Sequence, residues 1–197
     1  GNKFFQRGFK NGLKHGKWTW WYDNRKIKYI RYYDEDIKVG EWKEYHNDGS
    51  ILVDGIYDNG QQWNGIFKEG YYSDGKKAEE YRDYYENKSI MSEGLIIDEN
   101  EKIGDWTYYH NNASKKSNGQ YIKNNKNGEW NYWYKSGKEE KTGNYINDLM
   151  DGEWSGWYYT GQKFYLRTYN NGKKEGKWVW WFNDGKKKYE GNYLNDK

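Results

Sequence analysis

The sequence contains no cysteine, no proline and no long apolar run. Without cysteine, the chain forms no disulfide, no zinc–thiolate site and no thiol nucleophile, and its redox compartment stays undetermined. Proline removes a donor from a β-ladder, so its absence suits a chain that is nearly all paired strand. No stretch approaches the ~18 apolar residues of a membrane-spanning helix.

The chain is polar but rich in rings. Its mean hydropathy is −1.46 and 32% of its 197 residues are charged, a composition that usually buries too little apolar surface to fold. Aromatic residues make up 21% of the chain, and each Trp or Tyr can bury roughly 150–250 Å². Aromatic columns stacked from repeat to repeat can therefore replace an aliphatic core.

A glycine followed two residues later by tryptophan recurs along the chain, and neighbouring full copies on either side of the irregular middle are 24 residues apart. An aromatic residue stands three positions after each of these tryptophans, and a tyrosine stands fifteen after. The pattern predicts a β-hairpin: an aromatic strand, a turn at Lys135–Lys138 and a return strand ending at Tyr145. We expect Trp130→Ala to cost about 3–5 kcal/mol. The tryptophans predicted to form a structural ladder are Trp18, Trp42, Trp106, Trp130, Trp154 and Trp178.

This periodicity predicts an all-β fold, namely an elongated single-layer antiparallel β-meander of ~24-residue hairpins, twisted or curled, with no helical domain. We expect a single repeat array over residues 1–197, with regular repeats in 13–58 and 95–197 and irregular acidic repeats in 59–94. Within the irregular part, residues 76–85 fit either a strand or a short helical turn.

The Gly-x-Trp segment with its closing Gly-x-Tyr resembles MORN repeats, most closely the bacterial variant of YwqK-type antitoxin-like proteins. The resemblance implies a curled antiparallel meander that binds partners and has no catalytic activity, and it does not identify the partner. MORN arrays are linked to membrane lipids, dimerisation and scaffolding. A weaker similarity is to choline-binding repeats, which also build hairpins from Gly, Trp and Tyr. The stretches that carry the MORN resemblance are His15–Trp18, Lys126–Trp130, Met150–Trp154 and Lys174–Trp178.

Residues suited to catalysis or metal binding are not grouped in this sequence. His46 and His110 occupy the same repeat position, and we interpret them as polar substitutes for an aromatic residue; His15 stands apart from both. None has a sequence partner suited to general-base chemistry. A row of carboxylates ~10 Å apart is expected from the strand spacing, but a repeat generates such rows automatically. We expect no enzyme activity, no metal and no cofactor. The row comprises Asp105, Glu129 and Glu153.

Charge is distributed in three blocks. Residues 1–33 hold nine Lys or Arg and one Asp, net +8; residues 34–105 hold eight basic and nineteen acidic, net −11; residues 106–197 hold sixteen and ten, net +6. A solvated face is the plainer interpretation of the acidic block. Because breaks in local regularity tend to mark functional sites, we predict partner binding in its irregular part, at Glu79, Glu80, Tyr81, Asp83, Tyr84, Tyr85 and Glu86.

Three binding functions remain open. The first is protein binding, as an antitoxin or immunity-like module or a scaffold, with a basic toxin or nuclease as partner, because acidic residues interleaved with Tyr suit a basic surface. The second is a membrane-surface module that binds anionic lipid through basic ends; its lysines are Lys173, Lys174, Lys186, Lys187 and Lys188. The third is glycan or choline binding on the aromatic residues Trp133, Trp157 and Trp181.

Two further partners and the compartment follow from charge and sequence ends. Nucleic acid is not expected, because the acidic middle would repel a strand that touched the two basic ends. A homodimer is compatible with exposed sheet edges. A cytoplasmic location is slightly favoured. A secreted or surface-anchored form stays open, because the chain does not begin with Met and a processed leader upstream is therefore compatible with it.

Overall fold

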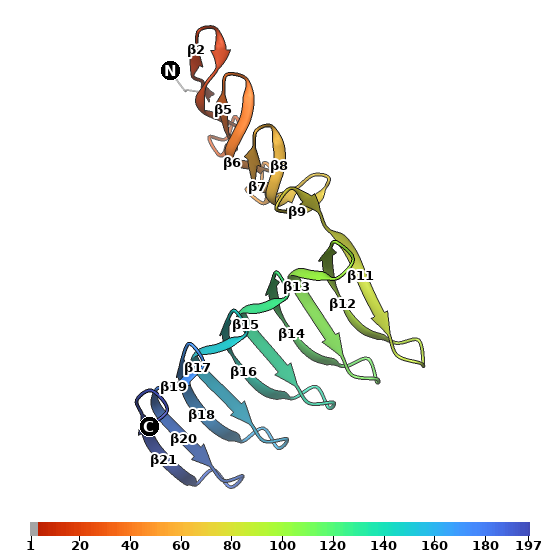
Figure 1. The fold of residues 1–197 in the computed structure, drawn as a ribbon, viewed down its shortest axis with the longest axis vertical. Coiled ribbons are helices and arrows are strands. Elements are labelled where there is room, and N and C mark those ends of the chain that lie inside the picture. Colours follow the sequence, from red (N-terminus) through yellow and green to blue (C-terminus); the bar gives the residue numbers. More distant parts are fainter. Residues whose placement is uncertain (1–3) are drawn as a thin grey trace. The chain divides into compact units, whose positions relative to one another are not determined.

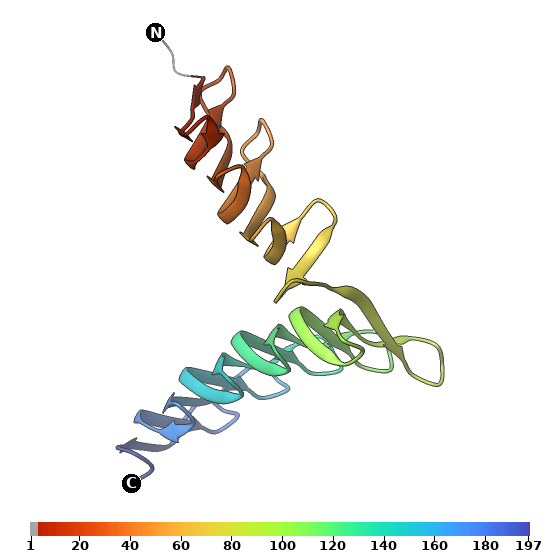
Figure 2. The same cartoon turned by 45° about the horizontal axis from the view of Figure 1, so that its top comes forward.

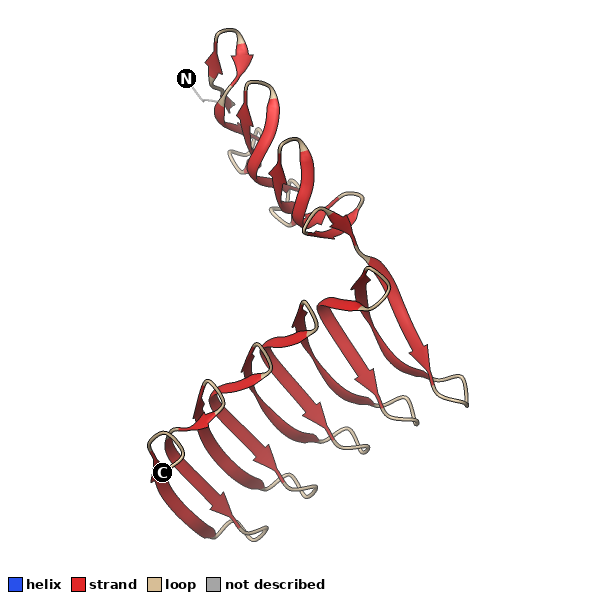
Figure 3. Cartoon of the chain, viewed as in Figure 1, coloured by secondary structure: helices blue, strands red, loops and turns tan. Residues whose placement is uncertain are grey.

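The computed structural model describes residues 4–197, whose contacts divide into two units, Gly1–Ala78 (unit 1) and Glu79–Lys197 (unit 2). Each unit is a meander of antiparallel strands that pair largely in chain order, and residues 4–197 contain no helix (Figure 1, Figure 3). The predicted all-β fold of hairpin repeats is confirmed. The single array over residues 1–197 stays a prediction.

Unit 1 holds an eight-stranded sheet in the order β1-β4-β5-β6-β7-β8-β9-β10 and a two-stranded sheet of β2 and β3 (Figure 2). Its strands are β1 Phe5–Gln6, β2 Phe9–Lys10, β3 Leu13–Lys14, β4 Gly16–Trp21, β5 Ile27–Asp34, β6 Ile37–Tyr45, β7 Ile51–Asp58, β8 Gln61–Phe67, β9 Gly70–Ser73 and β10 Lys76–Lys77.

Unit 2 holds one eleven-stranded sheet that runs from β11 to β21, with the short β19 paired to β18. Residues 76–85, which the sequence leaves between strand and helical turn, contain strands β10 and β11, and Tyr85 follows β11. The two strands belong to different sheets, with Ala78 between them. The strands are β11 Glu79–Tyr84, β12 Ile90–Ile97, β13 Glu101–Tyr109, β14 Lys115–Ile122, β15 Asn125–Trp133, β16 Glu139–Ile146, β17 Leu149–Trp157, β18 Lys163–Asn170, β19 Lys173–Lys174, β20 Gly176–Trp181 and β21 Lys187–Tyr193.

The core of each hairpin is its repeat tryptophan. Trp130 is only 1% exposed, and its indole Nε1 donates to the carbonyl oxygen of Gln120 at 3.2 Å. That carbonyl lies where the β14–β15 register shifts, between Asn118 and Gln120. Gly119 sits flat beneath the indole, since an added Cβ would stand 2.4 Å from its ring carbons. The same donation to a carbonyl ten or eleven residues earlier is made by Trp18, Trp42, Trp106, Trp154 and Trp178.

The local conformation of each repeat follows from its glycines and turns. Gly128, two residues before Trp130, has a φ of 69°, a left-handed conformation that glycine adopts without a steric penalty. The turn predicted at Lys135–Lys138 closes with a hydrogen bond from Gly137 N to Tyr134 O at 2.8 Å. Gly128 pairs with Tyr145 across the hairpin. Each hairpin therefore presents its tryptophan, closing tyrosine and turn in a fixed register.

Candidate binding site at the first hairpin of unit 2

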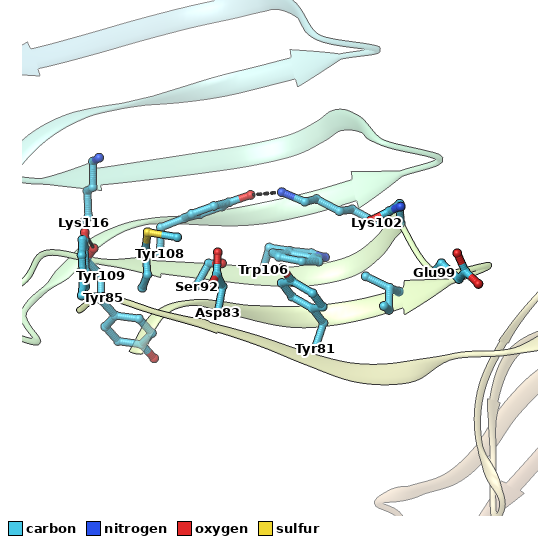
Figure 4. Close-up of a pocket in the computed structure, with 13 residues that line it drawn as sticks. Tyr81, Asp83, Tyr85, Ser92, Glu99, Lys102, Trp106, Tyr108, Tyr109 and Lys116 are labelled. Carbon is cyan, nitrogen blue, oxygen red and sulfur yellow. Dashed lines mark hydrogen bonds between the residues drawn. The ribbon is translucent and has the colours of Figure 1, made fainter. Parts of the chain in front are cut away.

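A hollow of about 300 Å³ lies beside the first three strands of unit 2, β11, β12 and β13 (Figure 4). Five rings line it, together with Met91 and Ile96. Three of the residues predicted as the partner surface, Tyr81, Asp83 and Tyr85, are part of this lining. The rings belong to Tyr81, Tyr85, Trp106, Tyr108 and Tyr109, and the charged groups to Asp83, Glu99, Lys102 and Lys116.

Strand β11 follows the repeat pattern with two changes that shape the hollow. Tyr81 pairs opposite Gly94 as Trp106 pairs opposite Gly119, so Tyr81 takes the place of the repeat tryptophan. Its ring centroid lies 5.7 Å from that of Trp106. Two residues later, Asp83 stands where β13 carries Tyr108, so a short carboxylate replaces a ring. Figure 4 shows the Asp83 carboxylate on the same face as the Tyr81 and Trp106 rings.

Hydrogen bonds fix the far wall of the hollow. The Tyr85 hydroxyl donates to the Tyr109 carbonyl oxygen at 2.8 Å, and the Tyr109 hydroxyl donates to Glu93 Oε1 at 2.6 Å. The bond to the carboxylate raises the pKa of Tyr109 to about 12. The same bond, followed by that from Arg82 Nε, lowers the pKa of Glu93. These bonds tie the end of β11 to β13, and β13 to β12.

Sequence reasoning missed a column of lysines that stand four residues before the repeat tryptophans. Lys102 Nζ lies 4.4 Å from the Trp106 ring centroid and Lys126 Nζ lies 4.5 Å from that of Trp130. Burial lowers the pKa of Lys126. Each lysine fills a cation–π slot made by its own hairpin. The recurrence of lysine at this position was the available signal. The other members are Lys14, Lys38 and Lys174, and Met150 holds the position in the remaining repeat.

The other predicted site residues do not enter the hollow. Tyr84 is 53% exposed on β11. The three tryptophans predicted to bind a ligand are half-buried and belong to later hairpins, so the structure does not bring them to the hollow. The backbone carbonyl oxygen of each of these tryptophans accepts a hydrogen bond from a side chain of the preceding repeat. The partner of the first is His110 Nε2, and the partners of the second and third are the hydroxyls of Tyr134 and Tyr158. The exposed carboxylates are Glu79, Glu80 and Glu86, and the half-buried tryptophans are Trp133, Trp157 and Trp181.

Within residues 4–197, no group of three or more His, Asp or Glu side chains could hold a metal ion. That part of the chain also lacks a helix long and apolar enough to cross a membrane. The three histidines are dispersed: His110 joins the turn contacts, and His15 Nδ1 lies 3.1 Å from Asp34 Oδ1.

One hairpin thus consists of a ring-bound lysine, a left-handed glycine, a buried tryptophan and a closing tyrosine. Three segments match the MORN repeat variant. They span residues 14–35, 38–59 and 174–195, about a third of the chain, and each begins at a lysine of the column. MORN repeats are generally non-enzymatic modules. The comparison with curated proteins finds no match.

Proposed function

We propose that this protein is a non-catalytic binding module whose hollow beside β11, β12 and β13 holds a protein partner. The observation that carries the proposal is the coincidence of this hollow with the acidic, tyrosine-rich strand that breaks the repeat pattern. Tyr81 and Tyr85 line the hollow, and Tyr84 is 53% exposed nearby on β11. Aromatic anchors in a pocket, rimmed by polar groups, are typical of the energetically dominant part of protein interfaces.

The charge of this end of unit 2 indicates a basic partner. Residues 79–105 hold nine Asp or Glu and three Lys or Arg, whereas residues 106–197 hold ten acidic and sixteen basic residues. An acidic surface attracts a basic one and accelerates their encounter. An antitoxin or immunity-like role against a basic toxin or nuclease is the specific form of this proposal, supported by the resemblance to the bacterial repeat variant.

The two alternatives receive less support from the contacts. In the basic cluster expected to bind anionic lipid, Lys174 Nζ lies 5.1 Å from the Trp178 ring centroid and Lys186 Nζ lies 3.4 Å from Asp184. Lys187 pairs with Glu190. The ion pairs of Lys186 and Lys187 offset part of the charge that would meet a phosphate. For glycan or choline binding, the tryptophans concerned are half-buried, which leaves less ring face for a ligand to stack on.

Site-directed photo-crosslinking tests the proposal. A benzophenone amino acid replaces Tyr84, which is exposed on β11 beside the hollow, or, as control, Tyr159, which is 61% exposed in a turn of the same unit. In extracts of the native host we expect the Tyr84 probe, and not the Tyr159 probe, to crosslink one basic protein at moderate salt. Glu79→Gln with Glu80→Gln should weaken that crosslink. Equal labelling by both probes, or no protein adduct at Tyr84, would refute the proposal.

A further inference from the structure

The repeats of this protein show how it stabilises a carboxylate placed two residues after the repeat aromatic. In β6 that residue is Glu44, and its Oε1 accepts a hydrogen bond from Arg31 Nη2 at 2.6 Å. The Arg31 guanidinium also lies 3.9 Å from the Tyr29 ring centroid and 5.0 Å from that of Trp42. The Glu44 carboxylate is thus paired with an arginine that stacks on neighbouring rings, and its Oε2 also lies 3.4 Å from Lys68 Nζ. Planar guanidinium groups favour both contacts.

Asp83 is the equivalent carboxylate in β11, two residues after Tyr81. Arg31 reaches Glu44 from β5, the strand that precedes β6 in its sheet. No strand of unit 2 precedes β11, because β11 is the first strand of its sheet. Within residues 4–197, Asp83 makes no ion pair; its Oδ1 accepts the backbone N–H of Tyr84 at 2.8 Å. The sheet that contains Asp83 therefore supplies no arginine equivalent to the one that pairs with Glu44.

The column of lysines four residues before the repeat tryptophans gives a second argument that the hollow can hold a cation. Four residues before Tyr81 stands Lys77, which pairs with Tyr72 in β9 of the other sheet. The ring slot of β11 thus receives no lysine from its own strand, unlike the slots at Trp106 and Trp130. Its lining nevertheless includes the Tyr81 ring, whose centroid lies 5.7 Å from that of Trp106. Rings beside a carboxylate form a site for a cation.

The two lysines that line the hollow do not neutralise this site. Lys102 Nζ donates to the Tyr108 hydroxyl at 3.0 Å and lies 5.4 Å from the Tyr121 ring centroid, so it is held on its own rings. Lys116 extends away from Asp83 (Figure 4). A volume of about 300 Å³ is at the lower end of ligand pockets, enough for one long side chain.

We infer that the hollow beside β11 binds an arginine side chain of the partner protein, with its guanidinium between the Tyr81 ring and the Asp83 carboxylate. This inference rests on the proposed function, because it names the partner group that the hollow receives. It is also consistent with the acidic balance of residues 79–105. The occupant is thus defined by chemistry: a planar cation on a basic protein segment.

Peptide binding by the full chain tests the inference. The probes are a fluorescein-labelled peptide of alternating Gly and Arg, the same peptide with citrulline, which is isosteric but uncharged, and the same peptide with Lys. Fluorescence anisotropy should show the arginine peptide binding at least about fivefold more tightly than the citrulline peptide. The arginine peptide should also bind more tightly than the lysine peptide. Equal binding of arginine and citrulline would overturn the inference, and equal binding of arginine and lysine would overturn the assignment to arginine.

Two matched variants locate the binding. Asp83→Asn keeps the oxygen that accepts the Tyr84 N–H but removes the charge, and we expect about three- to fivefold weaker binding of the arginine peptide. Glu129→Gln removes an exposed carboxylate of β15 and should leave the affinity unchanged. Equal losses in both variants would overturn the inference. If Asp83→Asn still gives the full Tyr84 crosslink, the arginine site fails while the proposed function stands. If peptide binding depends on Asp83 but the Tyr84 probe gives no protein adduct, the proposed function fails while the hollow still binds arginine.

Discussion

At the scale of single residues, the fold depends on pairs of a large ring and a missing side chain. Trp106 lies over Gly94, Trp130 over Gly119 and Trp154 over Gly143, with the would-be Cβ at 2.4 Å or less from the indole in every case. Where arginine replaces this glycine, at Arg31 and Arg167, its guanidinium stacks on nearby rings instead. The glycine column was visible in the sequence, but the contact that requires it was not.

Gly119→Ala should destabilise unit 2 by about 1–3 kcal/mol, because the methyl group would overlap the Trp130 indole and force it to move. Denaturant unfolding measures the loss, and the near-ultraviolet circular dichroism should change with it. The control is Gly137→Ala, where no atom lies within 4 Å of the new Cβ but φ is 85°. It should cost about 1 kcal/mol and leave the indole signal unaltered. An altered indole signal in the control alone would contradict this account.

Ala113→Gly should stabilise the protein. Ala113 has a φ of 62° at the turn position that Gly137 holds in the next repeat. A left-handed alanine costs roughly 1–2 kcal/mol, and glycine returns part of that gain as unfolded-chain entropy, about 0.5–1 kcal/mol. We therefore expect a net gain of about 0.5–1 kcal/mol by thermal or denaturant unfolding. A loss of stability would show that the turn is not strained as the structure indicates.

At the scale of elements, each hairpin is tied to the next by side-chain to backbone bonds. Tyr134 donates to the Trp157 carbonyl and Tyr158 to that of Trp181, at 2.8 and 2.9 Å. The first hairpin of unit 2 is tied in the same way, by the Tyr85 hydroxyl to the Tyr109 carbonyl at 2.8 Å, and the Tyr109 hydroxyl adds a bond to the carboxylate of Glu93. Both bonds join the hairpin that carries the hollow to the regular part of unit 2.

Tyr109→Phe should raise the pKa of Glu93, because its largest cause of depression, the Tyr109 hydroxyl, is removed while Arg82 remains. A carboxyl with a depressed folded-state pKa stabilises the fold above its unfolded pKa, and this contribution is lost as the pH falls through the folded value. The variant should therefore lose less stability on acidification than the wild type. Carbon-13 NMR titration of the Glu93 carboxyl gives the direct readout, and an unchanged pKa would contradict the assignment.

The elements also show what sequence reasoning could and could not reach. Strand and turn positions of the regular repeats follow from their periodicity, because alternation and left-handed glycines act locally. Strand β11 lacks the Gly-x-Trp signature, with Glu79 and Tyr81 in its place, so its type stayed open. The end of one sheet at Lys77 and the start of another at Glu79 depend on pairing partners, which periodicity does not specify. The hollow forms beside the first strand of the new sheet. The sequence therefore indicated only that this segment is irregular, and not that it lines a hollow.

At the scale of the whole chain, stability is a sum over neighbouring hairpins. In both units the strands pair largely with their neighbours in sequence, so each repeat tryptophan is buried by contacts with adjacent strands. Such arrays derive stability from each repeat and its interfaces. A substitution at Trp130 should therefore act mainly on the hairpins beside it.

Hydrogen exchange of the thirteen indole N–H groups tests the central claim, that the repeat tryptophans hold each array through buried, hydrogen-bonded rings. Nitrogen-15 labelling of tryptophan, with single Trp→Phe variants for assignment, resolves them by NMR. We predict that the six repeat tryptophans exchange slowly and the other seven, none of them fully buried, exchange faster. Similar rates for all thirteen, or fast exchange at Trp106, Trp130 and Trp154, would contradict the account.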